Sequence, residues 1–182
     1  MKTSFAIAVA VAMHTPMPQS LASEVAPQCI ECHGENGTAS NSGYPNLAGQ
    51  HPEYLSKQFR DFREGRRSSP FMNIVASRLS GDELTAAVGY FAALKADAPA
   101  PSGSKLSNPL YLSACASCHG VQANGAGEIP SLRGQQMFYL REQLLNFRLG
   151  QRNNSPGRVM NKVADSLSDA DIEALARYLS QM

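Results

Sequence analysis

Two segments with the pattern Cys-x-x-Cys-His constrain this chain more than any other feature of its sequence. They contain every cysteine of the chain and the histidine after each pair, namely Cys29, Cys32, His33, Cys115, Cys118 and His119. This spacing is the attachment signature of a c-type haem, because both thiols add across vinyl groups and the adjacent imidazole then lies beneath the iron. At this composition, one such segment arises by chance with a probability of about 0.002. The sequence therefore predicts two covalent haem c groups, with four thioether cysteines and with His33 and His119 as iron ligands.

Paired cysteines also occur in zinc sites and in disulfide or dithiol sites. A zinc site within one half would need a second Cys or His pair nearby, and neither half contains one. The two pairs could join into a single four-cysteine zinc site, which would leave both histidines unexplained. A disulfide or thioredoxin-like role is the remaining alternative for an exported chain. Haem attachment is the preferred interpretation because it uses both histidines.

The first 22 residues have the features of a secretory signal peptide. Lys2 gives a positive start, residues 5–13 form an apolar run, and small residues precede a cleavage site after Ala22. The apolar run is too short to span a bilayer. We therefore expect an exported protein with its signal peptide at residues 1–22.

The rest of the chain is a duplicated unit of roughly 75 residues. The cysteine motif recurs after 86 residues, and the Pro-x-Leu-x-Gly-Gln segment at 45–50 recurs at 130–135. Matching Tyr-Leu and Phe-Arg-x-Gly segments follow at an offset of 85. The segment between the copies is rich in Ala, Pro, Ser and Gly and has no periodicity, which is typical of a linker. We expect domain 1 at 23–95, the linker at 96–107 and domain 2 at 108–182.

Apolar residues in each copy recur with the spacing of α-helices. The segments 84–91 and 172–179 both place them at i, i+3, i+4 and i+7, and Ser80 and Ser168 precede these segments as capping-box residues. No segment alternates convincingly as a β-strand would. The predicted fold class is all-α, with two tandem domains that each form a small helical bundle around one covalent haem.

A count of histidines narrows the choice of the second axial ligand. Of four histidines, one lies in the expected signal peptide and two lie in the motifs, so His51 alone remains and two bis-histidine haems cannot form. Methionine is the ligand that high-potential c-type haems use instead. Met72 and Met160 lie 39 and 41 residues after their motif histidines, each in a proline-containing loop. We expect these two as iron ligands, whereas Met137 and Met182 are interpreted as core or surface residues.

These motifs resemble the dihaem cytochromes c4, which are built from two class I cytochrome c domains. The resemblance covers nearly all of the chain after residue 22. It implies helical domains with His/Met-ligated haems that face one another, and a periplasmic role in delivering electrons to a terminal oxidase or another respiratory acceptor. It also implies that a proline carbonyl orients each motif imidazole, a place that Pro45 and Pro130 match. The second methionine loop is three residues longer than the first, so the two methionines can be held differently and the two potentials can differ.

Three classes of function fit such a chain. An electron carrier needs filled axial positions and a docking surface. A haem subunit of a dehydrogenase complex would use the same chemistry in a permanent assembly, whereas a dihaem peroxidase would need an open iron position. We expect a carrier with no catalytic residues. Its expected partners are redox proteins, namely an electron-donor complex and a terminal oxidase or other acceptor, with peripheral association with membrane complexes as an option.

The charge balance argues against a nucleic acid partner. The chain has 16 Lys and Arg against 15 Asp and Glu, so it lacks the basic excess that nucleic acid binding needs. Seven arginines nevertheless cluster in matching stretches of the two copies: Arg60, Arg63, Arg66, Arg67, Arg141, Arg148 and Arg152. We interpret them as a solvated helix face or, alternatively, as partners of haem propionates or of a redox protein.

Overall fold

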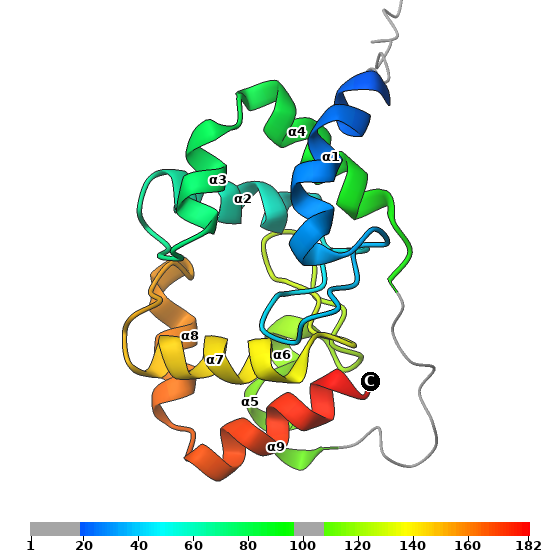
Figure 1. Cartoon of the computed structure of the whole chain (residues 1–182). Coiled ribbons are helices and arrows are strands. Elements are labelled where there is room, and N and C mark those ends of the chain that lie inside the picture. The colour runs from blue at the N-terminus through cyan, green and yellow to red at the C-terminus, as the bar shows by residue number, and fades with distance from the viewer. Residues whose placement is uncertain (1–18, 97–107) are drawn as a thin grey trace, which may run out of the picture.

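The computed structural model describes residues 19–96 and 108–182, which fold into two helical halves (Figure 1). The first half contains α1 (Gln19–His33), α2 (Pro52–Arg63), α3 (Met72–Arg78) and α4 (Gly81–Ala93). The second half contains α5 (Pro109–Ala114), α6 (Ala116–His119), α7 (Met137–Arg148), the 3₁₀ turn η2 (Pro156–Arg158), α8 (Val159–Asp165) and α9 (Asp169–Ser180). Over these described ranges the only β-type pairing is an isolated bridge between Ala126 and Ile129. The predicted all-α class is confirmed.

Two expected segments lie largely outside the described residues. Of the expected signal peptide at 1–22, only the last four residues are described, and they form the first turn of α1. Of the expected linker at 96–107, only Ala96 is described. Among the helices of the described part, none combines the length and the hydrophobicity that a membrane span requires.

The two halves have corresponding helices. In the first half α2 packs against α3 and α4, and in the second half α7 packs against α8 and α9 in the same way. The first helix of each half then contacts the last one, through the pairs α1–α4 and α5–α9. One difference is that α1 is continuous whereas α5 and α6 are separated at Cys115, where φ is −121° and ψ is −37°. The structure thus confirms that the sequence repeat is a structural repeat.

Each half buries its own hydrophobic core. The predicted apolar stripe of α4 packs with α2 in the first core: Leu55, Phe59, Phe62, Ala87, Val88 and Phe91. The equivalent stripe of α9 packs with α5 and α7 in the second: Tyr111, Leu140, Ile172, Leu175, Ala176 and Leu179. Met182 is only 4% exposed within the second core, and Met137 packs against it. Both methionines are therefore core residues, which is one of the two roles expected of them.

Capping boxes begin α4 and α9, as the sequence predicts. The hydroxyl of Ser80 accepts a hydrogen bond from the backbone N–H of Glu83 (3.2 Å), and the Glu83 carboxylate accepts one from the Ser80 N–H (2.7 Å). Ser168 and Asp171 make the same reciprocal pair at 3.2 and 2.9 Å. These bonds satisfy backbone donors that have no partner inside the first helical turn.

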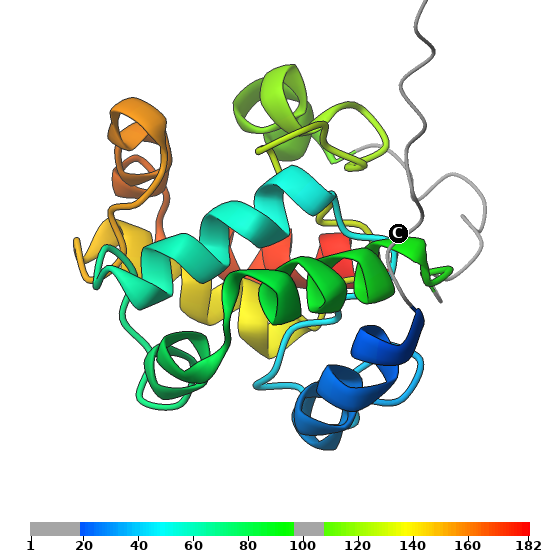
Figure 2. The same cartoon turned by 90° about the horizontal axis from the view of Figure 1, so that it is seen from above.

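The halves meet along the loops that follow the two motifs. In Figure 1 the loops 34–51 and 120–136 lie between the two sets of helices. Figure 2 shows the molecule from above, with α2 and α4 of the first half in front of the second half. The Tyr139 N–H donates to the Ser42 carbonyl (3.1 Å), and the His51 Nε2–H donates to the Asn124 carbonyl (2.7 Å). The spare histidine of the sequence is therefore engaged in a hydrogen bond between the halves.

We expect the cap of α9 to contribute measurably to stability. Replacing Ser168 with Ala removes the acceptor for the Asp171 N–H and should lower the free energy of unfolding by about 1 kcal/mol. Guanidinium unfolding followed by far-UV circular dichroism measures this change. The control is Ser113→Ala, an exposed serine within α5 that donates only to the Leu110 carbonyl, which should stay within about 0.5 kcal/mol. Equal losses in both variants would contradict the assignment of the cap.

Candidate haem-attachment sites

The first motif forms the C-terminal end of α1. Cys29 is buried in the first core, Cys32 is exposed, and His33 is buried at the last position of the helix. Neither cysteine forms a disulfide. The end of one helix therefore presents two thiols and one imidazole within a single turn, and this donor set fits the covalent attachment of haem c.

The second motif repeats this pattern in the other half. Cys115 is partly buried against the second core, Cys118 is exposed, and His119 is buried at the end of α6. Each motif thus has a cysteine against the core, an exposed cysteine and a buried imidazole. The two predicted attachment sites are separate, one in each half, and their side chains are disposed alike.

A backbone carbonyl orients each imidazole. The Nδ1–H of His33 donates to the carbonyl of Pro45 at 2.9 Å, and that of His119 donates to the carbonyl of Pro130 at 3.0 Å. Since a carbonyl can only accept, these bonds place the proton on Nδ1 and leave the Nε2 lone pair free for a metal ion. The expected roles of Pro45 and Pro130 are confirmed. Burial lowers the pKa of both imidazoles, against the effect of the proline bonds, and so favours the neutral form that binds iron.

A glycine after each histidine lets the chain turn back toward this carbonyl. Gly34 and Gly120 have φ of +80° and +78°, positive values that glycine adopts without steric cost. At Gly34 a Cβ atom would also lie only 2.0 Å from the carbonyl oxygen of Thr38. The loop that carries Pro45 therefore requires glycine at this position.

The thiol environments do not suit the alternative uses of these cysteines. Burial, aided by the second cysteine of each motif, raises the pKa of Cys29 and raises that of Cys115 to about 11. Redox-active dithiols instead have a thiol of lowered pKa. Among the described side chains, no group of three or more His, Cys, Asp and Glu is placed to hold a metal ion, so the joint four-cysteine zinc site is not assembled.

The two predicted methionine ligands lie near the starts of matching helices. Met72 is the first residue of α3 and packs against the first core, and Met160 is the second residue of α8 and is partly buried. A serine hydroxyl accepts the backbone N–H of each methionine, from Ser69 at 3.3 Å and from Ser155 at 3.1 Å. Their ligation of iron stays a prediction, and their equivalent positions in the two halves support it.

An asparagine after each methionine anchors its loop, which the sequence analysis missed. The Asn73 side chain donates to the carbonyls of Phe62 (2.6 Å) and Arg67 (3.0 Å). Asn161 makes the equivalent bonds to the carbonyls of Phe147 (2.6 Å) and Arg152 (2.8 Å). The repeated Met-Asn dipeptide was the available signal.

The extra residues of the second methionine loop lie before Met160, and therefore before the Asn161 side chain that anchors the loop. They form η2, where Gly157 and Arg158 have φ of 58° and 53°. The two donor bonds of the asparagine recur in both halves, but the acceptor bond does not. Asn73 Oδ1 accepts the Ser69 N–H (2.6 Å), whereas Asn161 Oδ1 is buried without a hydrogen-bond partner among the described residues, so the two loops are held differently before the methionine.

The clustered arginines fall into three groups. Arg60, Arg66 and Arg141 have side chains that are 53%, 50% and 42% exposed, in agreement with the solvated-face interpretation. Arg63 and Arg148 donate to backbone carbonyls near the ends of α3 and α8. For the third group, Arg67 and Arg152, the solvated-face interpretation is wrong, because they are only 8% and 7% exposed.

The two buried guanidiniums lie between the halves and contact uncharged side chains. Arg67 donates to Tyr139 (2.8 Å) and Gln143 (3.0 Å) of the other half. Arg152 donates reciprocally to Tyr54 (3.3 Å) and Gln58 (3.1 Å). Each guanidinium also lies over a phenylalanine ring of its own half, at 4.6 and 4.4 Å from the ring centre. Within the described ranges no carboxylate pairs with either guanidinium, although isolated buried charge is costly.

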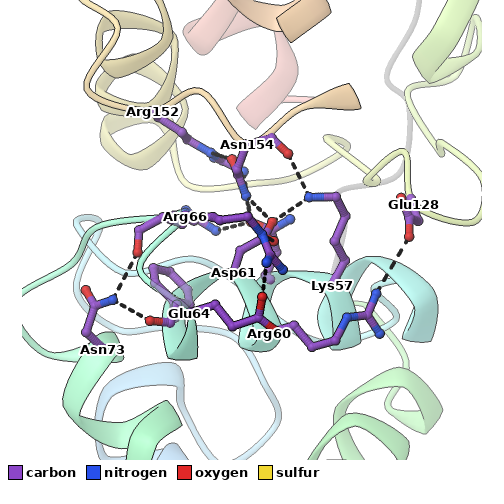
Figure 3. A network of polar contacts seen from close by, with 12 residues as sticks. Lys57, Arg60, Asp61, Glu64, Arg66, Asn73, Glu128, Arg152 and Asn154 are labelled. Carbon is purple, nitrogen blue, oxygen red and sulfur yellow. Dashed lines mark hydrogen bonds and ion pairs between the residues drawn. The ribbon is translucent and has the colours of Figure 1, made fainter. Parts of the chain in front are cut away.

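One buried carboxylate lies at the edge of this network. Asp61 accepts hydrogen bonds from Lys57, from Arg66 (2.8 Å) and from Asn154 of the other half (2.6 Å), as Figure 3 shows. Burial would raise the pKa of Asp61, but these three donors outweigh it and lower the pKa. Asp61 already pairs with two cations, Lys57 and Arg66. It therefore does not offset the charge of Arg67 and Arg152.

The positive charge at the interface is a second feature that fits haem. Burial would raise the pKa of the Tyr54 hydroxyl, but the charges of Arg152 and Arg67 outweigh it and lower the pKa. The region therefore favours negative groups. None of the described carboxylates pairs with these two arginines. A bound haem would bring two propionate carboxylates, which are anions of the kind that this region favours.

Comparisons with known proteins agree with these sites. The Cytochrome c family matches residues 104–182. The chain is 34% identical over 197 residues to the "Thiosulfate dehydrogenase electron acceptor" of Thiomonas intermedia, covering 99% of this chain and 91% of that protein. It is 35% identical to cytochrome c4 of Thiocapsa roseopersicina, covering 83% and 85% of the two chains. It also superposes on the crystal structure of reduced recombinant cytochrome c4 from Pseudomonas stutzeri with a TM-score of 0.80 and 30% identity, over 90% of this chain and 97% of that one.

Each motif should carry one covalent haem. A pyridine haemochrome assay of the exported protein should give two haems per chain that acid-acetone does not extract. The double variant Cys115→Ala, Cys118→Ala should retain one haem, on the first motif. Loss of both haems to acid-acetone from the wild-type protein would contradict thioether attachment.

Each methionine should fill one iron position. Replacing Met160 with Ala should remove about half of the long-wavelength Fe–S(Met) charge-transfer absorption of the ferric protein and should let one haem bind cyanide. Met72→Ala should do the same at the other haem. The control is Met137→Ala, which removes a core methionine near the second motif and should leave the absorption unchanged. A cyanide site opened by Met137→Ala would show that the repeat alignment is wrong.

Proposed function

Since the chain belongs to the dihaem cytochrome c4 family, we propose that it carries electrons in the periplasm, from a donor complex to a terminal oxidase or another respiratory acceptor. The chain is a c-type electron carrier with two covalent haems and is not an enzyme. The observation that carries the proposal is the matched pair of Cys-x-x-Cys-His sites, in which a proline carbonyl fixes each imidazole with Nε2 free.

In the proposed ligand set, the role of the named residues is to hold the two haems in place. Cys29, Cys32, Cys115 and Cys118 would attach the haems. His33 and His119 would each give one ligand to an iron, and Met72 and Met160 would each give the other. When bound, each haem supplies an iron that gains or loses one electron without changing ligands. Cys29 lies in one hydrophobic core and Cys115 packs against the other. Such apolar surroundings would disfavour the charge of the oxidised haem and so support positive potentials.

A dehydrogenase is the donor that the relatives suggest. The similar protein of Thiomonas intermedia is called a thiosulfate dehydrogenase electron acceptor, and it aligns with 99% of this chain. We therefore propose a periplasmic dehydrogenase, with thiosulfate dehydrogenase as the first candidate, on the donor side. Permanent docking on such an enzyme, as a haem subunit, is the second candidate function, and co-purification of the native protein distinguishes it from a free carrier.

Export and domain limits complete the proposal. We propose cleavage after Ala22, domain 1 at 23–95, a linker at 96–107 and domain 2 at 108–182. The separate hydrophobic cores, whose members fall within the two proposed domains, support these limits. Residues 23–98 contain 7 basic and 9 acidic side chains, and residues 99–182 contain 8 and 6. Opposite charge on the two domains supports orientation of the carrier by its partner's field.

Kinetics with purified partners tests this function. The reduced wild-type protein should be oxidised quickly by a periplasm-facing oxidase, at a rate that falls as ionic strength rises, and slowly by hydrogen peroxide. Reduced thiosulfate dehydrogenase should in turn reduce the oxidised protein. The matched control is Met160→Ala, in which an opened iron position should speed the reaction with peroxide. Rapid peroxide turnover by the wild-type protein would overturn the carrier function.

A further inference from the structure

One peptide group in each half makes two hydrogen bonds. Its carbonyl accepts from the motif histidine of its own half, and its N–H donates to a glutamine of the other half. The peptide between Pro45 and Asn46 accepts the His33 Nδ1–H through its carbonyl (2.9 Å). The N–H of this same peptide donates to Oε1 of Gln135, in the other half, at 2.7 Å. A single rigid unit therefore joins the imidazole of the first motif to a side chain of the second half.

The second half repeats this arrangement with the roles exchanged. The peptide between Pro130 and Ser131 accepts the His119 Nδ1–H (3.0 Å) and donates its N–H to Oε1 of Gln50, in the first half, at 2.9 Å. Gln50 and Gln135 are the last residues of the two Pro-x-Leu-x-Gly-Gln segments. Each copy of this segment thus supplies the proline for its own histidine and the glutamine for the histidine of the other copy.

Both glutamines are held rigidly. Their side chains are buried, at 6% and 7% exposure. The amide NH₂ of Gln135 donates to the Asn46 carbonyl and that of Gln50 to the Ser131 carbonyl, both at 3.0 Å. Each Oε1 also accepts the N–H of the next residue in its own chain segment, at the start of α7 or α2. This bidentate contact fixes the acceptor oxygen on the peptide N–H.

We propose that Gln50 and Gln135 are positioning residues that act across the interface, each setting the hydrogen bond of the motif histidine in the other domain and thereby the reduction potential of the haem there. A peptide whose N–H is hydrogen-bonded is polarised, so its carbonyl accepts more strongly. A stronger bond from Nδ1–H makes the imidazole a better electron donor to the metal ion. The oxidised iron is then favoured, so each glutamine lowers the potential of the opposite haem. This inference rests on the histidine ligation proposed above.

The test compares two repeat-related variants of the full-length holoprotein. In Gln135→Leu, which removes the acceptor of the Asn46 N–H, the domain 1 wave of a spectroelectrochemical titration should move to higher potential while the domain 2 wave stays. Gln50→Leu should move the domain 2 wave and leave the domain 1 wave. Met160→Ala assigns the waves, since it changes only the domain 2 iron. If Met160→Ala moves neither wave, the ligand set has failed, which is a separate result from failure of the glutamine inference.

Two further variants separate positioning from interface stability. His51→Leu removes a different hydrogen bond between the halves, to the Asn124 carbonyl, and should move neither wave. Gln135→Glu keeps an acceptor oxygen for the Asn46 N–H and should return the domain 1 wave to the wild-type value or below it. If Gln135→Leu does not incorporate haem, the potential of the domain 1 wave in Gln135→Glu still tests the proposal. Movement of the wave in the glutamine's own domain, equal movement of both waves, or no movement would overturn the proposal.

Discussion

The hydrogen bond between each motif imidazole and a proline carbonyl is the constraint on which both haem sites depend. It decides which nitrogen is free for iron, and it requires the chain to turn back on itself within about a dozen residues after the motif. Gly34 permits that turn because no side chain fits beside the Thr38 carbonyl. The loops so formed then create the surface on which the halves meet. The geometry of one ligand and the packing of two domains therefore have a common origin.

Features that depend on residues close in sequence could be predicted. The cysteine motifs, the helical stripes and the capping boxes at Ser80 and Ser168 all follow from spacing over a few positions, and the structure contains the stripes and boxes as expected. The fold class followed from the same patterns together with the repeat. Pro45 and Pro130 were reached through the family resemblance, since nothing local to a proline identifies its carbonyl as an acceptor.

Features that depend on the other half of the chain could not be predicted in this way. Arg67 lies in a run of charged residues that looks solvated, and it is buried only because Tyr139 and Gln143 arrive from a segment more than 70 residues away. Gln50 and Gln135 were visible as repeated residues, but their partners lie across the interface. The role of Asn73 could have been predicted from the sequence, because the Met-Asn dipeptide recurs in the second copy.

The contacts between the halves have the form that a two-fold symmetric dimer would show. Arg67 contacts Tyr139 as Arg152 contacts Tyr54, and the glutamines are exchanged in the same reciprocal way. Such an isologous surface is what two identical subunits present to each other. Because the two copies belong to one chain, their pairing does not depend on protein concentration, and each copy can carry residues that the other lacks. Asp61 of the first copy is buried and its repeat counterpart is Asn146, so the two copies differ at the edge of this otherwise reciprocal interface.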